Sequence, residues 1–187
     1  MTLAMIMSTA TAQASETITG HLHVAVDNGN DLKEGRLPLL TRAQVDAYIN
    51  EAFIYLRRSP KAARIIDEVL KNDDIFLLVN SVEENGTDVF PNSISVSWDP
   101  LLAMHTSNGG RQTPALALLH ELTHALHYMK NPKEFARNSG TKHPGYTDDE
   151  EYRTITMFET PVARELGEDI RFDHKGKDYL VTGPTVR

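Results

Sequence analysis

The residues in this chain best suited to chemistry are His120, Glu121 and His124, which form the pattern H-E-x-x-H. On a helix, side chains four positions apart lie one turn above each other on the same face. Two imidazoles in that arrangement can reach one Zn²⁺ at about 2.0–2.1 Å. The Glu121 carboxylate can then take a proton from a zinc-activated water molecule and return it to a leaving amine. The pattern therefore predicts a hydrolytic zinc site.

The surroundings of the pattern strengthen this interpretation. A chain with 8 histidines would contain the five residues by chance in roughly two sequences per hundred. However, Pro114–Lys130 is apolar on nearly every side, which predicts a central buried helix. Two histidines and a glutamate are costly to bury there, and a metal ion is the simplest compensation. The alternative is a pair of core histidines satisfied by hydrogen bonds.

A catalytic zinc site with one open position needs a third protein ligand. Cysteine is excluded because the chain has none. A histidine six residues after the second one is excluded because that position is Lys130. A carboxylate of the next helical stretch, Thr147–Gly167, remains, and Glu150, Glu151 and Glu159 are all available there.

Helical phase separates the three carboxylates. At 100° per residue, Glu151 lies within about 40° of three apolar residues and so faces the core. These residues are Ile155, Phe158 and Val162. Glu150 lies on another side, and its spacing from Thr147 predicts a capping box, so its loss should leave zinc in place. We expect Glu151 to be the third ligand, and Glu150 and Glu159 are the alternative ligands. The opposing interpretation is that Glu151 is only a partly solvated helix carboxylate.

Glu159 lies next to Pro161, which cannot continue a regular helix. We expect a kink or a restart there, with Thr160 as the new cap. His127 follows His124 by one turn and is more typical of a residue supporting the ligands than of a ligand itself. Several side chains could stabilise the oxyanion of a tetrahedral intermediate. They are His143, Tyr146, Tyr152, Arg164, Arg171 and Tyr179, and the sequence does not choose among them.

Alternating and helical apolar patterns predict the remaining elements. Strands are expected at Thr17–Asp27, Ile75–Val79, Val89–Phe90 and Ile94–Trp98, helices at Thr41–Arg58 and from Ser59-Pro60 onward, a short helical turn at Asp99-Pro100, and loops at Asn108–Gly110 and Asn131–Tyr146. We expect Ser93–Trp98 to be an edge strand that pairs with an extended peptide substrate. The tail, Glu168–Arg187, is polar and should be only partly ordered.

The basic residues around the junction of the first two helices form a second notable cluster. They are Arg57, Arg58, Lys61 and Arg64. Such a run is usually a solvated helix face, and the functional alternative is a docking patch for an acidic partner.

Composition limits the classes of function. The chain has 187 residues, enough for one domain, and a formal net charge of −7. Phosphate backbones and anionic membrane surfaces should repel it, and no apolar run approaches the roughly 18 residues of a membrane span. We therefore expect neither nucleic-acid nor membrane partners, and a monomer. Residues 1–16 resemble a flexible leader or a secretion signal, although they lack the basic start typical of signal peptides.

Several segments together resemble the NleD-like family of bacterial effector zinc metallopeptidases. They are LALLHELTHALHYM, EEYRTI, ETPVARELG and SVSWDP, within residues 74–172. The resemblance implies His120 and His124 as metal ligands, Glu121 as base, and an acidic segment at Glu150-Glu151. Family members commonly have Glu-Asn where this chain has Glu159-Thr160. The resemblance further implies a secreted protease delivered into host cells, with mitogen-activated protein kinases as possible targets.

These observations lead to one expected architecture, an α+β zincin-like single domain over residues 17–187. A small β-sheet should pack on the central H-E-x-x-H helix, and the helix carrying the third ligand should cross beneath it. The expected function is that of a zinc-dependent endopeptidase acting on an extended segment of a protein. The alternatives are an inactive binding or inhibitory module of the same fold, and a zinc hydrolase of a non-peptide amide.

Overall fold

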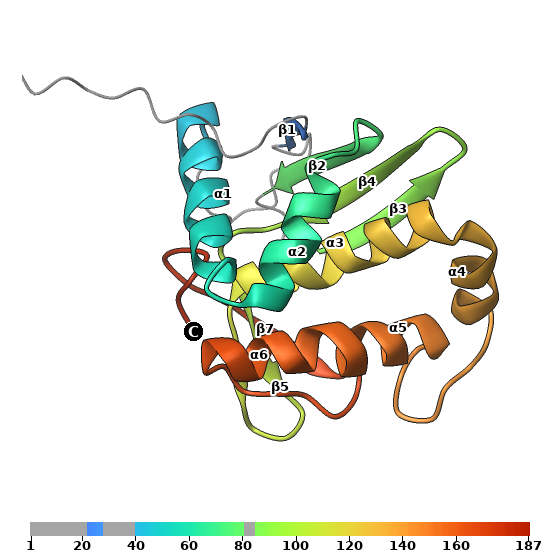
Figure 1. The fold of residues 1–187 in the computed structure, drawn as a ribbon. Helices are drawn as coiled ribbons and strands as arrows, with labels where there is room; N and C mark the ends of the chain where they lie inside the picture. Colours follow the sequence, from blue (N-terminus) through green and yellow to red (C-terminus); the bar gives the residue numbers. More distant parts are fainter. Residues whose placement is uncertain (1–21, 28–39, 81–84) are drawn as a thin grey trace, which may run out of the picture.

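The computed structural model describes residues 22–27, 40–80 and 85–187. The expected leader and residues 17–21 of the first predicted strand lie outside these ranges. The described chain mixes helices with a four-stranded and a three-stranded sheet, which confirms the mixed α and β class (Figure 1). Within the described ranges, no helix combines the length and apolar character needed to cross a bilayer.

The four-stranded sheet has the order β1-β2-β4-β3. Its strands are β1 (His23–Asp27), β2 (Ile75–Asn80), β3 (Gly86–Phe90) and β4 (Ser93–Trp98). The first two strands and β4 run parallel, and β3 returns antiparallel along β4. The prediction that Ser93–Trp98 is an edge strand is therefore wrong, because the β3–β4 hairpin places β3 outside it. The alternation seen in β4 reflects two differently covered faces, not an open edge.

Two helices connect β1 to β2 and begin where the sequence predicts. Helix α1 (Arg42–Leu56) starts after Thr41, which forms a capping box with Gln44. Helix α2 (Pro60–Val69) starts after Ser59, whose hydroxyl accepts from the Ala62 amide. A parallel strand pair needs such a crossover, and both helices pack against the central helix Pro114–Lys130.

The central helix α3 (Pro114–Lys130) has the predicted boundaries. Thr113 caps its start by accepting from the Leu116 amide. The indole of Trp98 donates to the Pro114 carbonyl at 2.8 Å and joins β4 to the first turn of α3. In Figure 1, α3 runs between the four-stranded sheet and the C-terminal helices. Its apolar side chains are buried on both sides, as its continuous apolar pattern requires.

The predicted C-terminal helical stretch forms one row of three segments alongside α3. They are α5 (Asp149–Arg153), the π-helix η1 (Thr154–Glu159) and α6 (Thr160–Leu166). Asp148 caps the start of α5, so the predicted capping box of Thr147 with Glu150 is wrong. Instead of a restart capped by Thr160, the chain widens into π-helical turns, in which the Thr160 amide donates to the Ile155 carbonyl.

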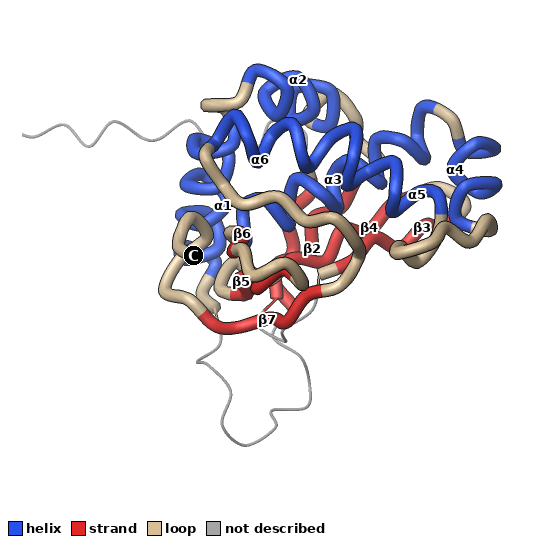
Figure 2. Tube along the Cα trace, turned by 90° about the horizontal axis from the view of Figure 1, so that it is seen from below, coloured by secondary structure: helices blue, strands red, loops and turns tan. Residues whose placement is uncertain are grey.

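Four elements of the structure are not predicted by the sequence patterns. Helix α4 (Pro132–Ser139) occupies part of the predicted loop after α3, and strands β5 (Leu102–Thr106), β6 (Arg111–Gln112) and β7 (Gly176–Leu180) form the second sheet. Only a turn precedes β5 where a short helical turn was expected after Asp99. The tail is ordered, because β7 pairs with β5 in antiparallel register (Figure 2).

Candidate metal centre

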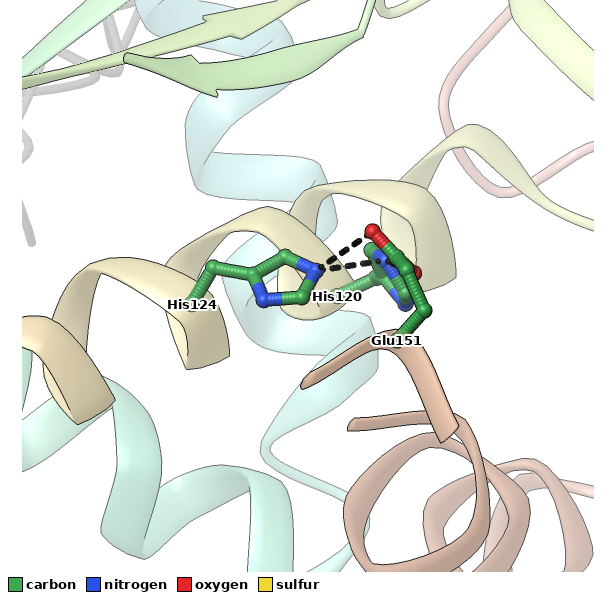
Figure 3. A group of neighbouring side chains, drawn as sticks. All are labelled: His120, His124 and Glu151. Atoms are coloured by element: carbon green, nitrogen blue, oxygen red, sulfur yellow. Dashed lines mark hydrogen bonds and ion pairs between the residues drawn. The ribbon is translucent and has the colours of Figure 1, made fainter. Parts of the chain in front are cut away.

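Three side chains from two elements meet beside α3. His120 and His124 come from α3, and Glu151 comes from the first turn of α5 (Figure 3). The Nε2 atoms of the two imidazoles are 2.9 Å apart. Glu151 Oε2 lies 3.1 Å from His120 Nε2, and Glu151 Oε1 lies 3.3 Å from His124 Nε2. The predicted trio therefore forms one cluster that could hold a metal ion.

The chemistry of this donor set fits a small cation. Ligand atoms about 2.1 Å from a tetrahedral zinc ion would be roughly 3.4 Å from one another, close to the observed separations. Two imidazole nitrogens at 2.9 Å cannot both carry protons that point at each other, and two lone pairs would repel. A shared proton or a metal cation resolves the conflict. Glu151 Oε2 is also buried without a hydrogen bond of suitable geometry.

The outer nitrogen of His120 is held by a buried carboxylate. His120 Nδ1 lies 2.9 Å from Glu159 Oε2, and Arg171 and Gln112 donate to the same carboxylate at 2.6–3.1 Å and 2.9 Å. Arg171 also lies 3.1 Å from Nδ1, but a guanidinium can only donate. Because Arg171 keeps the Glu159 carboxylate ionised, this carboxylate can only accept, and we assign the proton to Nδ1 in its contact with Glu159. This tautomer leaves the Nε2 lone pair directed at the cluster.

The same relation, in weaker geometry, holds for the second imidazole. His124 Nδ1 lies 3.4 Å from Glu150 Oε1 and 3.3 Å from the hydroxyl of Thr154. Glu150 is 2% exposed and also contacts His127 Nδ1 at 2.7 Å. The predicted capping role of Glu150 is therefore wrong. His127 meets Glu150 and does not join the trio, in agreement with its expected supporting role.

The charges in the cluster shift the pKa values of its members. Burial disfavours a charged His120, but contacts with Glu151 and Glu159 prevail and raise its pKa. Burial acts in the same way on His124, whose contacts with Glu150 and Glu151 raise its pKa to about 10. Burial would raise the pKa of Glu159, but Arg171 and His120 lower it to about 2. The site thus stabilises positive charge between the two imidazoles.

Glu121 lies beside the trio at the surface of a cleft. Its carboxylate accepts a hydrogen bond of 2.8 Å from the hydroxyl of Thr87 on β3. The cleft consists of two adjoining hollows that share Asn85, Glu121 and His174 in their linings. One hollow extends along β3, and the other extends toward the second sheet. The carboxylate is thus open to a substrate while its position is fixed.

The structure distinguishes the candidates for oxyanion stabilisation. Of the six predicted side chains, only Arg171 lines the cleft around the trio. His143 stacks on Tyr152, Tyr146 meets both rings edge-on, and the three line neither hollow, while Tyr179 stacks on His105. Arg164 belongs to α6 and lines neither hollow.

His174 is a site residue that the sequence analysis missed. It follows Arg171 by three positions in the tail, and its Nε2 lies 3.2 Å from Glu151 Oε2. The hydroxyl of Thr147 lies 2.9 Å from its Nδ1. No periodicity surrounds His174, and the polar tail resembles a solvated segment. The sequence feature that could have indicated His174 is its position three residues after Arg171, another candidate site residue, in the tail.

Comparison with solved structures finds a distant likeness. No protein-family model matches the chain, and no curated protein matches it either. Among solved structures, the chain is similar to the catalytic domain of Clostridium botulinum neurotoxin serotype F, with 15% sequence identity and a TM-score of 0.45. The match covers 83% of this chain and 56% of the neurotoxin chain, so this chain spans little more than half of that length. The resemblance to NleD-like peptidases stays a prediction.

Replacing Glu151 or Glu150 should weaken metal binding, and the two replacements should do so to different extents. We expect Glu151→Gln to lose most zinc affinity, because a neutral amide replaces a charged ligand atom. Glu150→Gln should weaken affinity about 10–100-fold, because His124 and His127 lose the carboxylate that orients them. Zinc titration monitored by calorimetry tests both variants, with the exposed Glu51→Gln on α1 as control. Unchanged affinity in Glu150→Gln would contradict the role assigned to this buried carboxylate.

The buried Glu159 should make the metal-free protein sensitive to acid. Its folded pKa of about 2 lies below the ordinary value of 4.5, so its contribution to stability is present above pH 4.5. That contribution is lost as the pH falls from 4.5 toward 2, and it amounts to about 3 kcal/mol. Urea unfolding of Glu159→Gln between pH 2.5 and 7 should show lower stability at pH 7 and a flatter pH dependence. A slope as steep as that of the wild type would contradict this assignment.

Proposed function

We propose that the protein is a zinc-dependent endopeptidase of zincin-like architecture. The observation that carries the proposal is the meeting of His120 Nε2, His124 Nε2 and a Glu151 carboxylate beside an open cleft, with Glu121 next to them. Three protein ligands leave one coordination position for chemistry, as in catalytic zinc sites. A bound zinc ion would supply a Lewis acid that polarises a carbonyl group and lowers the pKa of a water molecule.

In this proposal Glu121 moves the proton. Its carboxylate takes a proton from the attacking water and delivers it to the nitrogen of the breaking peptide bond. The hydrogen bond from Thr87 keeps one carboxylate oxygen on the side of β3 and leaves the other free. Glu150 and Glu159 hold the imidazoles from behind.

His174 is the proposed donor to the oxygen of the scissile carbonyl. Burial lowers its pKa, so the imidazole is neutral at pH 7. With the Thr147 hydroxyl donating to Nδ1, the ring proton is on Nε2, which lies 3.2 Å from Glu151 Oε2. Because Glu151 is a candidate metal ligand and His174 lines both hollows, this N–H lies next to the position of a developing oxyanion. The guanidinium of Arg171 is instead occupied by Glu159.

The free side of β3 supports an extended substrate. Within the described residues β3 pairs only with β4, and its other edge borders the hollow lined by Gly86, Thr87, Asp88 and Val89. An extended peptide can add to such an edge through main-chain hydrogen bonds. From the resemblance to effector peptidases, we further propose that the protein is secreted and acts on proteins of a host cell, with mitogen-activated protein kinases as the first candidates.

Replacing the proposed base separates catalysis from metal binding. Glu121→Gln should retain zinc in stoichiometric amount and lower the rate of peptide cleavage by about 10²–10⁴-fold, because the proton carrier is lost. Metal analysis and mass spectrometry of new N-termini in a host-cell proteome measure both quantities, with Glu51→Gln as control. A zinc-loaded wild type that generates no new N-termini would favour the inactive binding module instead. A wild type without zinc would contradict every zinc-dependent reading.

His174→Phe tests the proposed oxyanion donor. We expect kcat to fall about 10²–10³-fold at an unchanged zinc content, because the donor acts mainly in the transition state. His143→Phe is the matched control, since this imidazole lies outside the cleft and should leave kcat unchanged. An effect of His174→Phe on KM alone would show that the side chain binds substrate without stabilising the transition state.

A further inference from the structure

A groove separate from the cleft lies between α2, the C-terminal half of α3 and η1. Its volume is about 520 Å³, and its apolar lining consists of Ile65, Leu126 and Phe158. None of its lining residues belongs to either hollow of the cleft. At 100° per residue, Leu126 points roughly 120–160° away from His120 and His124. The groove therefore occupies the other side of α3 from the candidate metal centre.

The rim of the groove carries an excess of positive charge. Four cations line it, Lys61, Arg64, Lys71 and Lys130, against two carboxylates, Asp67 and Glu68. Asp67 pairs with Arg57 at 2.7 Å, outside the groove. Glu68 pairs with Lys71 at 3.4 Å and with Lys130 at 3.0 Å. Both local carboxylates are thus already engaged by other cations.

Lys61 and Arg64 have no carboxylate within salt-bridge distance among the described residues. The ammonium of Lys61 lies 4.9 Å from the centre of the Phe158 ring, and Arg153 lies 4.7 Å from the same ring. Arg64 is exposed. A positive rim on a chain with a net charge of −7 is a local inversion of sign, and such a field concentrates anionic partners.

We propose that this groove is a docking site for an acidic peptide segment of a partner protein that inserts one apolar side chain against Phe158. Lys61 and Arg64 pair with the carboxylates, and Leu126 and Ile65 contact the apolar anchor. If the protein is the proposed peptidase, the partner is its substrate protein, and the scissile segment of that protein then reaches the cleft on the other side of α3. Only this identification of the partner rests on the proposed function. Of the predicted basic cluster, the docking role thus falls to Lys61 and Arg64. Arg57 pairs with Asp67, and Arg58 stacks on Tyr55.

Peptide binding tests the groove without requiring catalysis. The probe is a fluorescein-labelled dodecapeptide of Glu and Asp residues with one central Leu, titrated with the full chain and followed by anisotropy. Its counterparts replace the acids by Gln and Asn, or the Leu by Ala. We expect each counterpart to bind about tenfold more weakly than the acidic peptide. We also expect 0.5 M salt to lower the affinity for the acidic peptide. Glu121→Gln should bind as the wild type does, so failure of the peptidase proposal would not affect this result.

Charge reversal locates the binding site. The double variant Lys61→Glu with Arg64→Glu should bind the acidic peptide at least about tenfold more weakly. The matched control, Lys133→Glu with Lys142→Glu, makes the same change in net charge away from the groove and should bind within about twofold of the wild type. Equal losses in both double variants would show non-specific attraction and overturn the proposal.

Two further outcomes are decisive. Phe158→Ala should remove the preference for the Leu-containing peptide over the Ala-containing one and leave the salt dependence of binding unchanged. This result would show the apolar contact, which charge reversal does not test. Circular dichroism and zinc content confirm that each variant is folded. The protein could instead bind phosphatidylserine vesicles more strongly than the peptide and lose this binding in the Lys61→Glu, Arg64→Glu double variant. That result would identify an anionic membrane surface as the ligand and overturn the proposal.

Discussion

The burial of two imidazoles side by side in α3 is the constraint on which the rest of the structure depends. His120 and His124 are 4% and 6% exposed, and their Nε2 atoms face each other at 2.9 Å. Polar rings are stable in such a place only if every nitrogen has a partner. The inner nitrogens share Glu151, and the outer nitrogens need carboxylates behind them. The C-terminal helical row must therefore present three acidic side chains to one short stretch of α3.

The π-helix η1 explains how one row of helix meets that demand. In a regular α-helix, Glu159 would lie about 80° around the axis from Glu151. Wider π-helical turns rotate less per residue, which swings Glu159 back toward the face of Glu151. The same turns accommodate Pro161, whose ring would otherwise clash with the carbonyl four residues before it. A local irregularity of a kind often found at functional sites thus places the support for His120.

Local chemistry determined what could be predicted from the sequence. The boundaries of α3, the starts of α1 and α2, and the inward phase of Glu151 depend on neighbours within a few residues, and the structure agrees with each of them. The missed features depend on residues far apart in the chain. Glu150 resembled a capping residue because its partners, His124 and His127, lie more than twenty positions away.

The tail shows the same dependence on distant partners, and its Arg171 also explains why the carboxylate behind His120 stays charged. Glu159 is kept ionised by Arg171, and Glu150 lies 3.2 Å from Arg153. Each imidazole is thus backed by an acid that is itself backed by an arginine, which favours a proton on Nδ1 and a free lone pair on Nε2. Arg171 can fill its role only if residues 168–180 are fixed. The pairing of β7 with β5 fixes them, so a strand far from α3 in the sequence helps to set the tautomer of His120.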